Sequence, residues 1–244
     1  NASEIQDALV AFIVSAKNSI DIASGHLRLQ AITNALLEKS RAEPWVRIRV
    51  YLDGQEYTSQ SYFEEEQAEI DNCMSLAGFD EDEIRDCSEM GAHFGYALHE
   101  AGIDSKYKYY SYRWHYYTAL QMHHKYVIVD KETVASGSYN LSPNAEWNTM
   151  ENLVFYDALY YPDLVVQFNE NFESIWHTGE GLYSDLIEEV RAPANPEFPI
   201  MFEPMALKWP EVSELRATIE EHCPALFSDE YIEEPWEHHT CSRN

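Results

Sequence analysis

Long apolar runs are missing from this chain. The longest, at residues 8–14, is far shorter than the ~18 residues that a membrane-spanning helix needs. We interpret it as part of one face of an amphipathic helix. We therefore expect no transmembrane segment. Hydrophobic residues still make up 45% of the 244 residues, enough for a sizeable core. This length suits one domain with additions or two small ones.

Basic residues are scarce. The chain has 16 Lys and Arg against 43 Asp and Glu, a net charge of −27. This imbalance argues against DNA binding by charge alone and against docking on an anionic membrane. The simplest explanation of the acidic residues is solubility or a saline habitat. The acids concentrate in residues 61–100, whereas residues 105–125 contain no acid. A basic pocket inside an acidic shell is therefore compatible with the sequence.

Cysteine is limited to four residues, which fall in two separated pairs. We expect disulfides Cys73–Cys87 and Cys223–Cys241, and hence a periplasmic or secreted protein, with a cytoplasmic one as the alternative. The start Asn1-Ala2-Ser3 resembles the product of a protease cut, so a removed signal peptide or upstream domain is compatible with it. Two alternatives for the cysteines stay open: four reduced thiols, or a zinc site in the tail from His222, Cys223, His238, His239 and Cys241, which lacks a C-x2-C pair.

Apolar periodicity predicts alternating helices and strands, and therefore an α/β fold. The expected strands are residues 19–23, 47–52, 125–130, 133–137 and 152–156, and the expected helices are 3–16, 29–40 and 163–176. The strand–helix–strand opening predicts a parallel pair with a right-handed crossover. Residues 55–104 are interpreted as an acidic insertion. Five prolines within residues 193–210 argue against long regular elements after residue 179 until a helix near 211–222.

One region concentrates residues that split a phosphodiester. It contains H-x-K-x4-D at residues 123–130, G-S-x-N at 137–140 and E-N at 151–152. A His supplies a nucleophile, Lys and Asn neutralise phosphate oxygens, and Glu orients the imidazole. Strand alternation places His123 and Lys125 on one face and His124 on the other. Outside this region the sequence contains no second H-x-K.

These three pieces, in this order, resemble the phospholipase D superfamily, specifically over residues 121–155 and in element order over 3–178. The resemblance implies a mixed β-sheet flanked by helices on both faces, as a catalytic domain at 3–178 followed by a Pro-rich C-terminal extension at 179–244. It also implies two-step chemistry through a phosphohistidine, without a metal or cofactor. Asp130 would have a mainly structural role in it.

The resemblance assigns the remaining roles residue by residue. His123 would be the nucleophile, and Lys125 would hold a non-bridging phosphate oxygen. Ser138 and Asn140 would donate hydrogen bonds to the phosphate. Glu151 would pair with the nucleophilic His, which fixes its tautomer.

A second His must protonate the leaving group, because one imidazole does not serve as nucleophile and general acid at once. The family offers two solutions, a twofold homodimer or a second HKD half outside this chain. We favour the homodimer. Three interpretations of the tyrosine-rich residues 105–118 stay open. They would stack nucleic-acid bases, line a cleft for a lipid headgroup, or form a half-buried strand without contact to a substrate.

The sequence therefore predicts a metal-independent phosphodiesterase of phospholipase D type, and we favour a phospholipid substrate. Hydrolysis and transfer to an alcohol, as in a transphosphatidylase, share this chemistry. The alternatives are an endonuclease that cleaves DNA or RNA by the same mechanism, and a non-catalytic phosphate-binding module.

Overall fold

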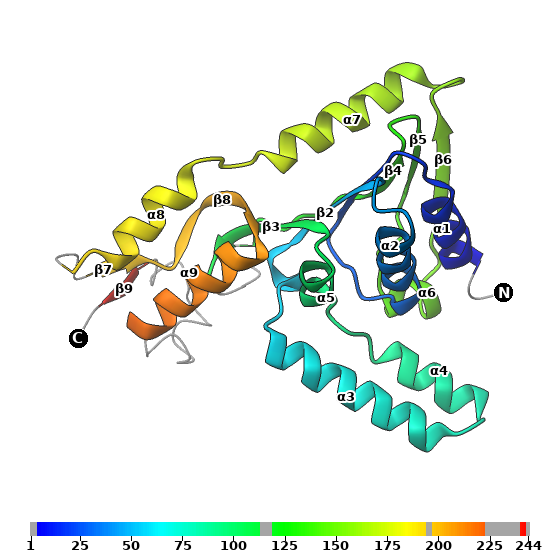
Figure 1. Ribbon diagram of the computed structural model, residues 1–244, viewed down its shortest axis with the longest axis horizontal. Helices are drawn as coiled ribbons and strands as arrows, with labels where there is room; N and C mark the ends of the chain where they lie inside the picture. The colour runs from blue at the N-terminus through cyan, green and yellow to red at the C-terminus, as the bar shows by residue number, and fades with distance from the viewer. Residues whose placement is uncertain (1–3, 113–118, 194–196, 223–239, 243–244) are drawn as a thin grey trace.

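The computed structural model describes residues 4–112, 119–193, 197–222 and 240–242. Its centre is a seven-stranded sheet with strand order β6-β5-β4-β1-β2-β3-β8 (Figure 1). The strands of this sheet are β1 (Ser19–Ser24), β2 (Arg47–Asp53), β3 (Asp104–Ser111), β4 (Lys125–Val129), β5 (Thr133–Gly137), β6 (Leu153–Asp157) and β8 (Met201–Lys208). A second, two-stranded sheet pairs β7 (Glu197–Pro199) with β9 (Thr240–Ser242).

Helices connect most of these strands, and the ends of the expected elements shift by only a residue or two, as helix and strand ends commonly do. The helices are α1 (Glu4–Ser15), α2 (Gln30–Ala42), the 3-10 turn η1 (Gly54–Glu56), α3 (Gln60–Ala77), α4 (Glu81–Glu89), α5 (Gly95–Glu100), α6 (Pro143–Trp147), α7 (Pro162–Trp176), α8 (Leu182–Arg191) and α9 (Trp209–His222). The expected insertion at 55–104 is thus largely helical.

Strand direction brings the motif residues to one edge of the sheet. Strands β1, β2 and β3 are parallel, whereas β4, β5, β6 and β8 pair antiparallel with their neighbours. The carboxyl ends of β1, β2, β3 and β5 therefore lie beside the amino ends of β4, β6 and β8. We call this the motif edge. In open α/β sheets, ligands bind beyond the carboxyl ends of the parallel strands.

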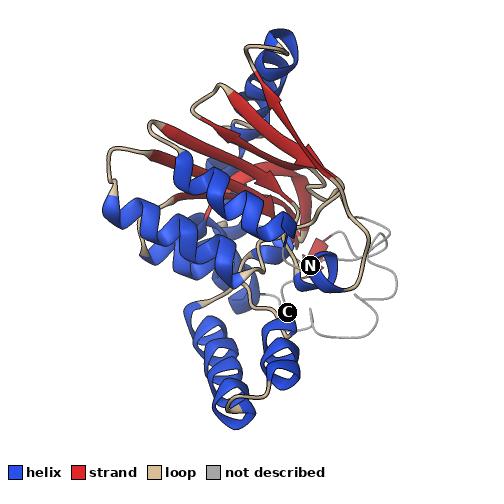
Figure 2. Ribbon diagram, turned by 90° about the vertical axis from the view of Figure 1, so that its right-hand side faces the viewer, coloured by secondary structure: helices blue, strands red, loops and turns tan. Residues whose placement is uncertain are grey.

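Helices cover both faces of the sheet, which confirms the expected mixed sheet with helices on both sides (Figure 2). On one face, Leu9 of α1 and Leu36 of α2 pack among buried strand residues such as Ile22. On the other face, Phe172 and Trp176 of α7 pack with a separate set of buried strand residues, Ala23, Tyr51, Tyr126, Ile128 and Val134. Strands β1, β2, β4 and β5 alternate between the two sets, as the pleat requires.

A buried ion-pair network fixes α7 on its face. Arg49 on β2 forms a bidentate pair with Asp21 on β1, at 2.7 and 2.8 Å, and a second pair with Glu173 on α7. Its guanidinium also lies 4.7 Å from the centre of the Phe172 ring. Burial would lower the pKa of Arg49, but the two carboxylates raise it. The position of α7 matters because this helix borders the candidate site.

The tail contains more regular structure than its prolines suggested, so that expectation was wrong. Helix α8 occupies residues 182–191, and β8 is hydrogen-bonded to β3 as an edge strand of the main sheet. The prolines occupy tolerated positions. Pro193 follows α8, Pro204 lies on an edge strand, and Pro210 lies in the first turn of α9.

Helices α3 and α4 form a hairpin that projects from the sheet (Figure 1). A disulfide joins Cys73 on α3 to Cys87 on α4, with the two Cα atoms 5.6 Å apart, as predicted. The other expected pair involves Cys223, which lies outside the described residues, so that pair stays a prediction. None of the described helices combines the length and the apolarity needed to cross a membrane.

Candidate active site

His123 and Lys125 lie at the motif edge, where the chain enters β4. Lys125 is the first residue of β4 and faces Ser24, the last residue of β1, in the strand register. His123 precedes the strand rather than belonging to it, and its side chain is exposed. The backbone carbonyl of His124 accepts a hydrogen bond from Gly25, which ties this segment to the end of β1.

The two motif side chains contact each other. Lys125 Nζ lies 3.3 Å from His123 Nε2 and donates to the His123 carbonyl oxygen at 3.2 Å. The alternation argument predicted this proximity. Partial burial lowers the pKa of Lys125, while the charge of Glu151 acts in the opposite direction. An ammonium that donates to Nε2 requires an imidazole without a proton on that atom, which is the state of a nucleophile.

Glu151 belongs to a hydrogen-bonded group at the same edge. Its two carboxylate oxygens accept from Ser138 Oγ and, at 2.7 Å, from Thr149 Oγ1. These bonds lower the pKa of Glu151. Within the described residues no hydrogen bond joins Glu151 to His123, so their pairing stays a prediction. Thr149 was missed by the sequence argument, because a lone Thr two residues before the motif carries no signal.

Gly137 allows this group to form. Ser138 N–H donates to the Asn152 carbonyl oxygen at 3.1 Å, and Asn152 N–H donates to Ser138 Oγ at 3.1 Å. A Cβ atom on residue 137 would lie 2.1 Å from the Asn152 carbonyl oxygen. The glycine of G-S-x-N is therefore explained by close backbone contact, because the approach leaves no room for a side chain.

Asn140 lies behind the edge rather than on the cavity wall described below. Its side-chain oxygen is buried and has no hydrogen-bond partner within the described part of the chain. Its carbonyl oxygen accepts from Ser142 N–H at 2.8 Å, and Ser142 then caps α6. The predicted contact of Asn140 with a phosphate stays a prediction.

Asp130 anchors the opposite end of β4. Its carboxylate accepts hydrogen bonds from the backbone N–H groups of Lys17, Asn18 and Ser19, the shortest at 2.6 Å. Burial acts to raise the pKa of Asp130, but these hydrogen bonds and the charge of Lys17 lower it overall. Since β4 separates Asp130 from His123, its contacts fit the structural role that the resemblance implied.

Two open cavities meet at the histidines. The first, of about 590 Å³, is lined by residues of all three motifs, including Lys125, Ser138 and Glu151. The second, of about 480 Å³, lies toward β3 and β8. His123 and His124 line both. Desolvation, together with the nearby charges of Lys108 and Lys125, lowers the pKa of His124.

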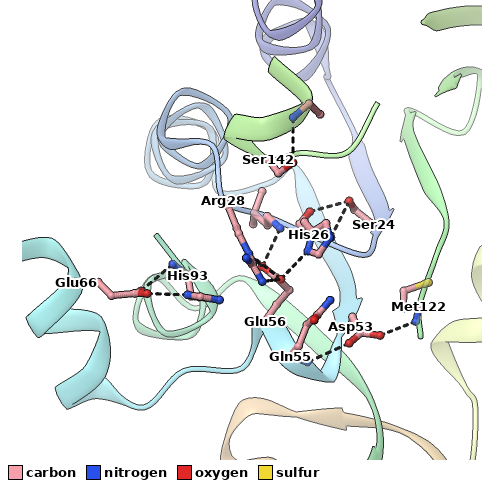
Figure 3. A network of polar contacts seen from close by, with 12 residues as sticks. Ser24, His26, Arg28, Asp53, Gln55, Glu56, Glu66, His93, Met122 and Ser142 are labelled. Carbon is pink, nitrogen blue, oxygen red and sulfur yellow. Dashed lines mark hydrogen bonds and ion pairs between the residues drawn. The ribbon is translucent and has the colours of Figure 1, made fainter. Parts of the chain in front are cut away.

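A network of polar contacts lies beside the segment that leads to His123 (Figure 3). Asp53, at the end of β2, accepts from Met122 N–H at 2.6 Å, one residue before His123. Glu56 forms ion pairs with His26, at 2.9 Å, and with Arg28, at 2.8 Å. Burial would raise the pKa of Glu56, but these two partners lower it. Sequence reasoning missed these contacts because the partners of Glu56 are 28 and 30 residues away from it, and Asp53 and Met122 are 69 residues apart.

No group of three or more His, Cys, Asp or Glu side chains is placed to hold a metal ion within the described residues. The tail residues of the alternative zinc site fall mostly outside those ranges. Metal-independent chemistry therefore stays a prediction.

Comparison with known proteins decides the family. A family model described as "Cardiolipin synthase, PLD-like domain" matches residues 9–176, which contain every motif residue. The chain belongs to the phospholipase D superfamily. The match extends from α1 to the end of α7, so it includes both helical layers and six strands of the main sheet.

Relatives within the superfamily match a shorter part of the chain. The mitochondrial cardiolipin hydrolase of Mus musculus is 35% identical over 96 residues, which is 38% of this chain and 38% of the relative. That of Danio rerio is 31% identical over 90 residues, or 37% and 35%. The chain thus spans little more than a third of these relatives. The structure of Nuc from Salmonella typhimurium, a phospholipase D family member, has 22% identity and a TM-score of 0.46, and the match covers 70% of this chain and 86% of that one.

Proposed function

We propose that this chain is a metal-independent phosphodiesterase that works through a phosphohistidine at His123. The observation that carries the proposal is the 3.3 Å contact between Lys125 Nζ and His123 Nε2 at the mouth of a cavity shared with Ser138 and Glu151. A nucleophile, a cation and hydrogen-bonding groups converge there on a space large enough for a phosphate and its substituents.

The first step transfers the phosphoryl group to the enzyme. His123 Nε2 attacks phosphorus, a P–N bond forms, and the bond from phosphorus to the leaving oxygen breaks. Lys125 turns from the imidazole to a non-bridging oxygen, where its charge offsets the negative charge of the transition state. Ser138 turns its single hydroxyl proton from Glu151 to a second phosphate oxygen, the Asn140 amide donates to a third, and Glu151 orients the nucleophile.

The second step releases the product. A water oxygen attacks phosphorus, the P–N bond breaks, and a phosphomonoester leaves while His123 is regenerated. An alcohol in place of water would give transfer instead of hydrolysis. A second His protonates the leaving oxygen in the first step and takes the proton of water in the second. We propose that a twofold homodimer supplies it, with a second HKD half outside this chain as the alternative.

A phospholipid is the substrate that we favour. Two of the similar proteins are cardiolipin hydrolases, and the net charge of −27 opposes a nucleic-acid polyanion. The second candidate is an endonuclease, which the basic side chains of Lys108 and Lys125 in the cavities beside the histidines support. A phosphate-binding module without turnover is the third, and the complete motif argues against it.

The decisive experiment compares the wild type with His123→Asn, in excess EDTA, on phospholipid micelles and on plasmid DNA. We expect the wild type to release a phosphomonoester from lipid and to form an acid-labile phosphoprotein, and His123→Asn to do neither. His93→Asn, which removes an imidazole bound to Glu66 outside the cavities, is the matched control. Plasmid nicking without lipid cleavage would make this protein a nuclease. Full activity of His123→Asn would refute the mechanism.

The disulfide in the α3–α4 hairpin supports an oxidising compartment, so we propose a periplasmic or secreted location. The test is the oxidation state of Cys73 and Cys87 in protein isolated from its native source, measured by alkylation and mass. Free thiols at both positions would argue for a cytoplasmic protein.

A further inference from the structure

The second cavity, on the β3 side of the histidines, has a character of its own. It is about 480 Å³ in volume. Its wall combines the cation of Lys108 with Tyr51 and Thr178 and with the apolar side chains of Met122 and Ile175. None of these residues belongs to the HKD, G-S-x-N or E-N motifs. Because His123 lines both cavities, a substrate whose phosphate lies at His123 extends directly into this second space.

Lys108 lacks a close counterion in a chain where acids outnumber bases. No carboxylate lies within ion-pair distance of its Nζ across the described ranges. Asp53 is the nearest negative influence on it, but that carboxylate is fully buried and is already bound to Gln55 N–H and Met122 N–H. Partial burial lowers the pKa of Lys108, and the charge of Asp53 acts in the opposite direction.

Tyr51 contributes a second donor to the same wall. Its side chain is 1% exposed, and its hydroxyl makes no hydrogen bond of good geometry with the described residues. The Thr178 side chain lies close enough to act on the pKa of Tyr51, although burial raises that pKa overall. An anion bound beside Lys108 would give this buried hydroxyl an acceptor of good geometry.

The order of the strands sets the separation of the two cations. Lys125 is on β4 and Lys108 on β3, with β1 and β2 between them. Three strand intervals of about 4.8 Å place the two backbones about 14 Å apart. Lys108 lines the second cavity and Lys125 the first, each together with His123 and His124, and both charges act on the pKa of His124. Two anions a few bonds apart on one molecule therefore fit this arrangement.

We propose that this cavity is a second phosphate subsite, in which Lys108 and Tyr51 bind a second phosphodiester of the same phospholipid. The inference rests on the proposed function, since it presumes that the first phosphate lies at His123. The apolar side chains of Met122 and Ile175 favour a lipid, because they cover its glycerol and the first acyl carbons. The subsite selects phospholipids that carry two phosphates over those that carry one.

The test measures kcat/KM on diphosphatidylglycerol and on phosphatidylglycerol, each diluted in neutral detergent micelles. The wild type should prefer the two-phosphate lipid. Lys108→Gln should reduce the ratio of the two kcat/KM values about tenfold, toward one, because a charge-assisted hydrogen bond is lost. Tyr51→Phe should reduce it less. Lys131→Asn removes the same charge at the β4–β5 turn, where residue 131 has φ 62°, and should leave the ratio unchanged.

An unchanged ratio in Lys108→Gln, or an equal fall on both lipids, would overturn the subsite. If the wild type cleaves oligonucleotides but neither lipid, the lipid assignment is overturned. Binding separates this inference from the proposed function. His123→Asn and the double variant His123→Asn/Lys108→Gln are titrated with micelles of each lipid. A two-phosphate preference that needs Lys108 supports the subsite even without turnover, and no preference overturns it.

Discussion

The carboxylate of Asp53 accepts a hydrogen bond from Met122 N–H at 2.6 Å, directly before His123, the proposed nucleophile. Its other oxygen accepts from Gln55 N–H at 3.1 Å. A side chain at the end of β2 thus fixes the segment that enters β4 (Figure 3). Burial raises the pKa of Asp53, and these two backbone hydrogen bonds partly offset that effect.

We predict that Asp53→Asn destabilises the protein by about 1–3 kcal/mol. The Asn side chain has an NH2 group in place of one carboxylate oxygen, so one of the two backbone N–H groups loses its acceptor and faces another donor. The loosened segment should also lower kcat more than it raises KM. Urea denaturation and steady-state kinetics measure both effects. The control is Asp104→Asn, an exposed position at the start of β3, with an expected change within about 0.5 kcal/mol. Equal effects of the two variants would contradict the positioning role of Asp53.

A second prediction concerns Gly137→Ala. The new methyl group would lie 2.1 Å from the Asn152 carbonyl oxygen, so the β5 and β6 ends must separate. We expect a loss of about 1–3 kcal/mol or more, and a loss of activity because Ser138 and Glu151 no longer meet. Gly102→Ala is the control. It has open space but φ 70°, so it should cost about 1–2 kcal/mol from backbone strain and leave activity unchanged.

The contact between His123 and Lys125 was predictable because the two residues are close in sequence. The H-x-K spacing on an expected strand correctly placed Lys125 against His123. Long-range partners were not predictable. Glu56 meets His26 and Arg28 only through the parallel pairing of β1 and β2, and no local pattern in the sequence records which strands become neighbours.

The tail shows the same limit in the fold. Its prolines argue against regular structure, yet Pro204 is accommodated on β8 because an edge strand leaves one row of backbone groups unpaired. Whether a strand lies at an edge is a property of the whole sheet. The local pattern of residues 201–208 therefore did not predict a strand there.

A third prediction follows from Asp130, whose pKa is lowered overall in the folded protein. A carboxylate with a lowered pKa stabilises the fold above its unfolded value, about 3.9, and this stabilisation is lost as pH falls through the folded value. Asp130→Asn should therefore lower the free energy of unfolding by a constant amount from pH 8 to about pH 5, and the difference should narrow below about pH 4. Urea denaturation of both proteins across this pH range measures the difference, and an equal difference at every pH would contradict the prediction.

The last prediction concerns the hairpin of α3 and α4. Because the Cys73–Cys87 disulfide closes a loop of 14 residues, its removal should cost about 3 kcal/mol. The loss should be local, since the hairpin projects from the sheet (Figure 1). In the double variant Cys73→Ser/Cys87→Ser, we expect hydrogen exchange to accelerate in α3 and α4 but not in β1, β2 or β4, and kcat to change by less than about twofold. The contacts of α4 with α6 offer one route to the site, because α6 follows Asn140. Faster exchange in β5 and β6, with a fall in kcat, would show that the hairpin supports the motif edge instead.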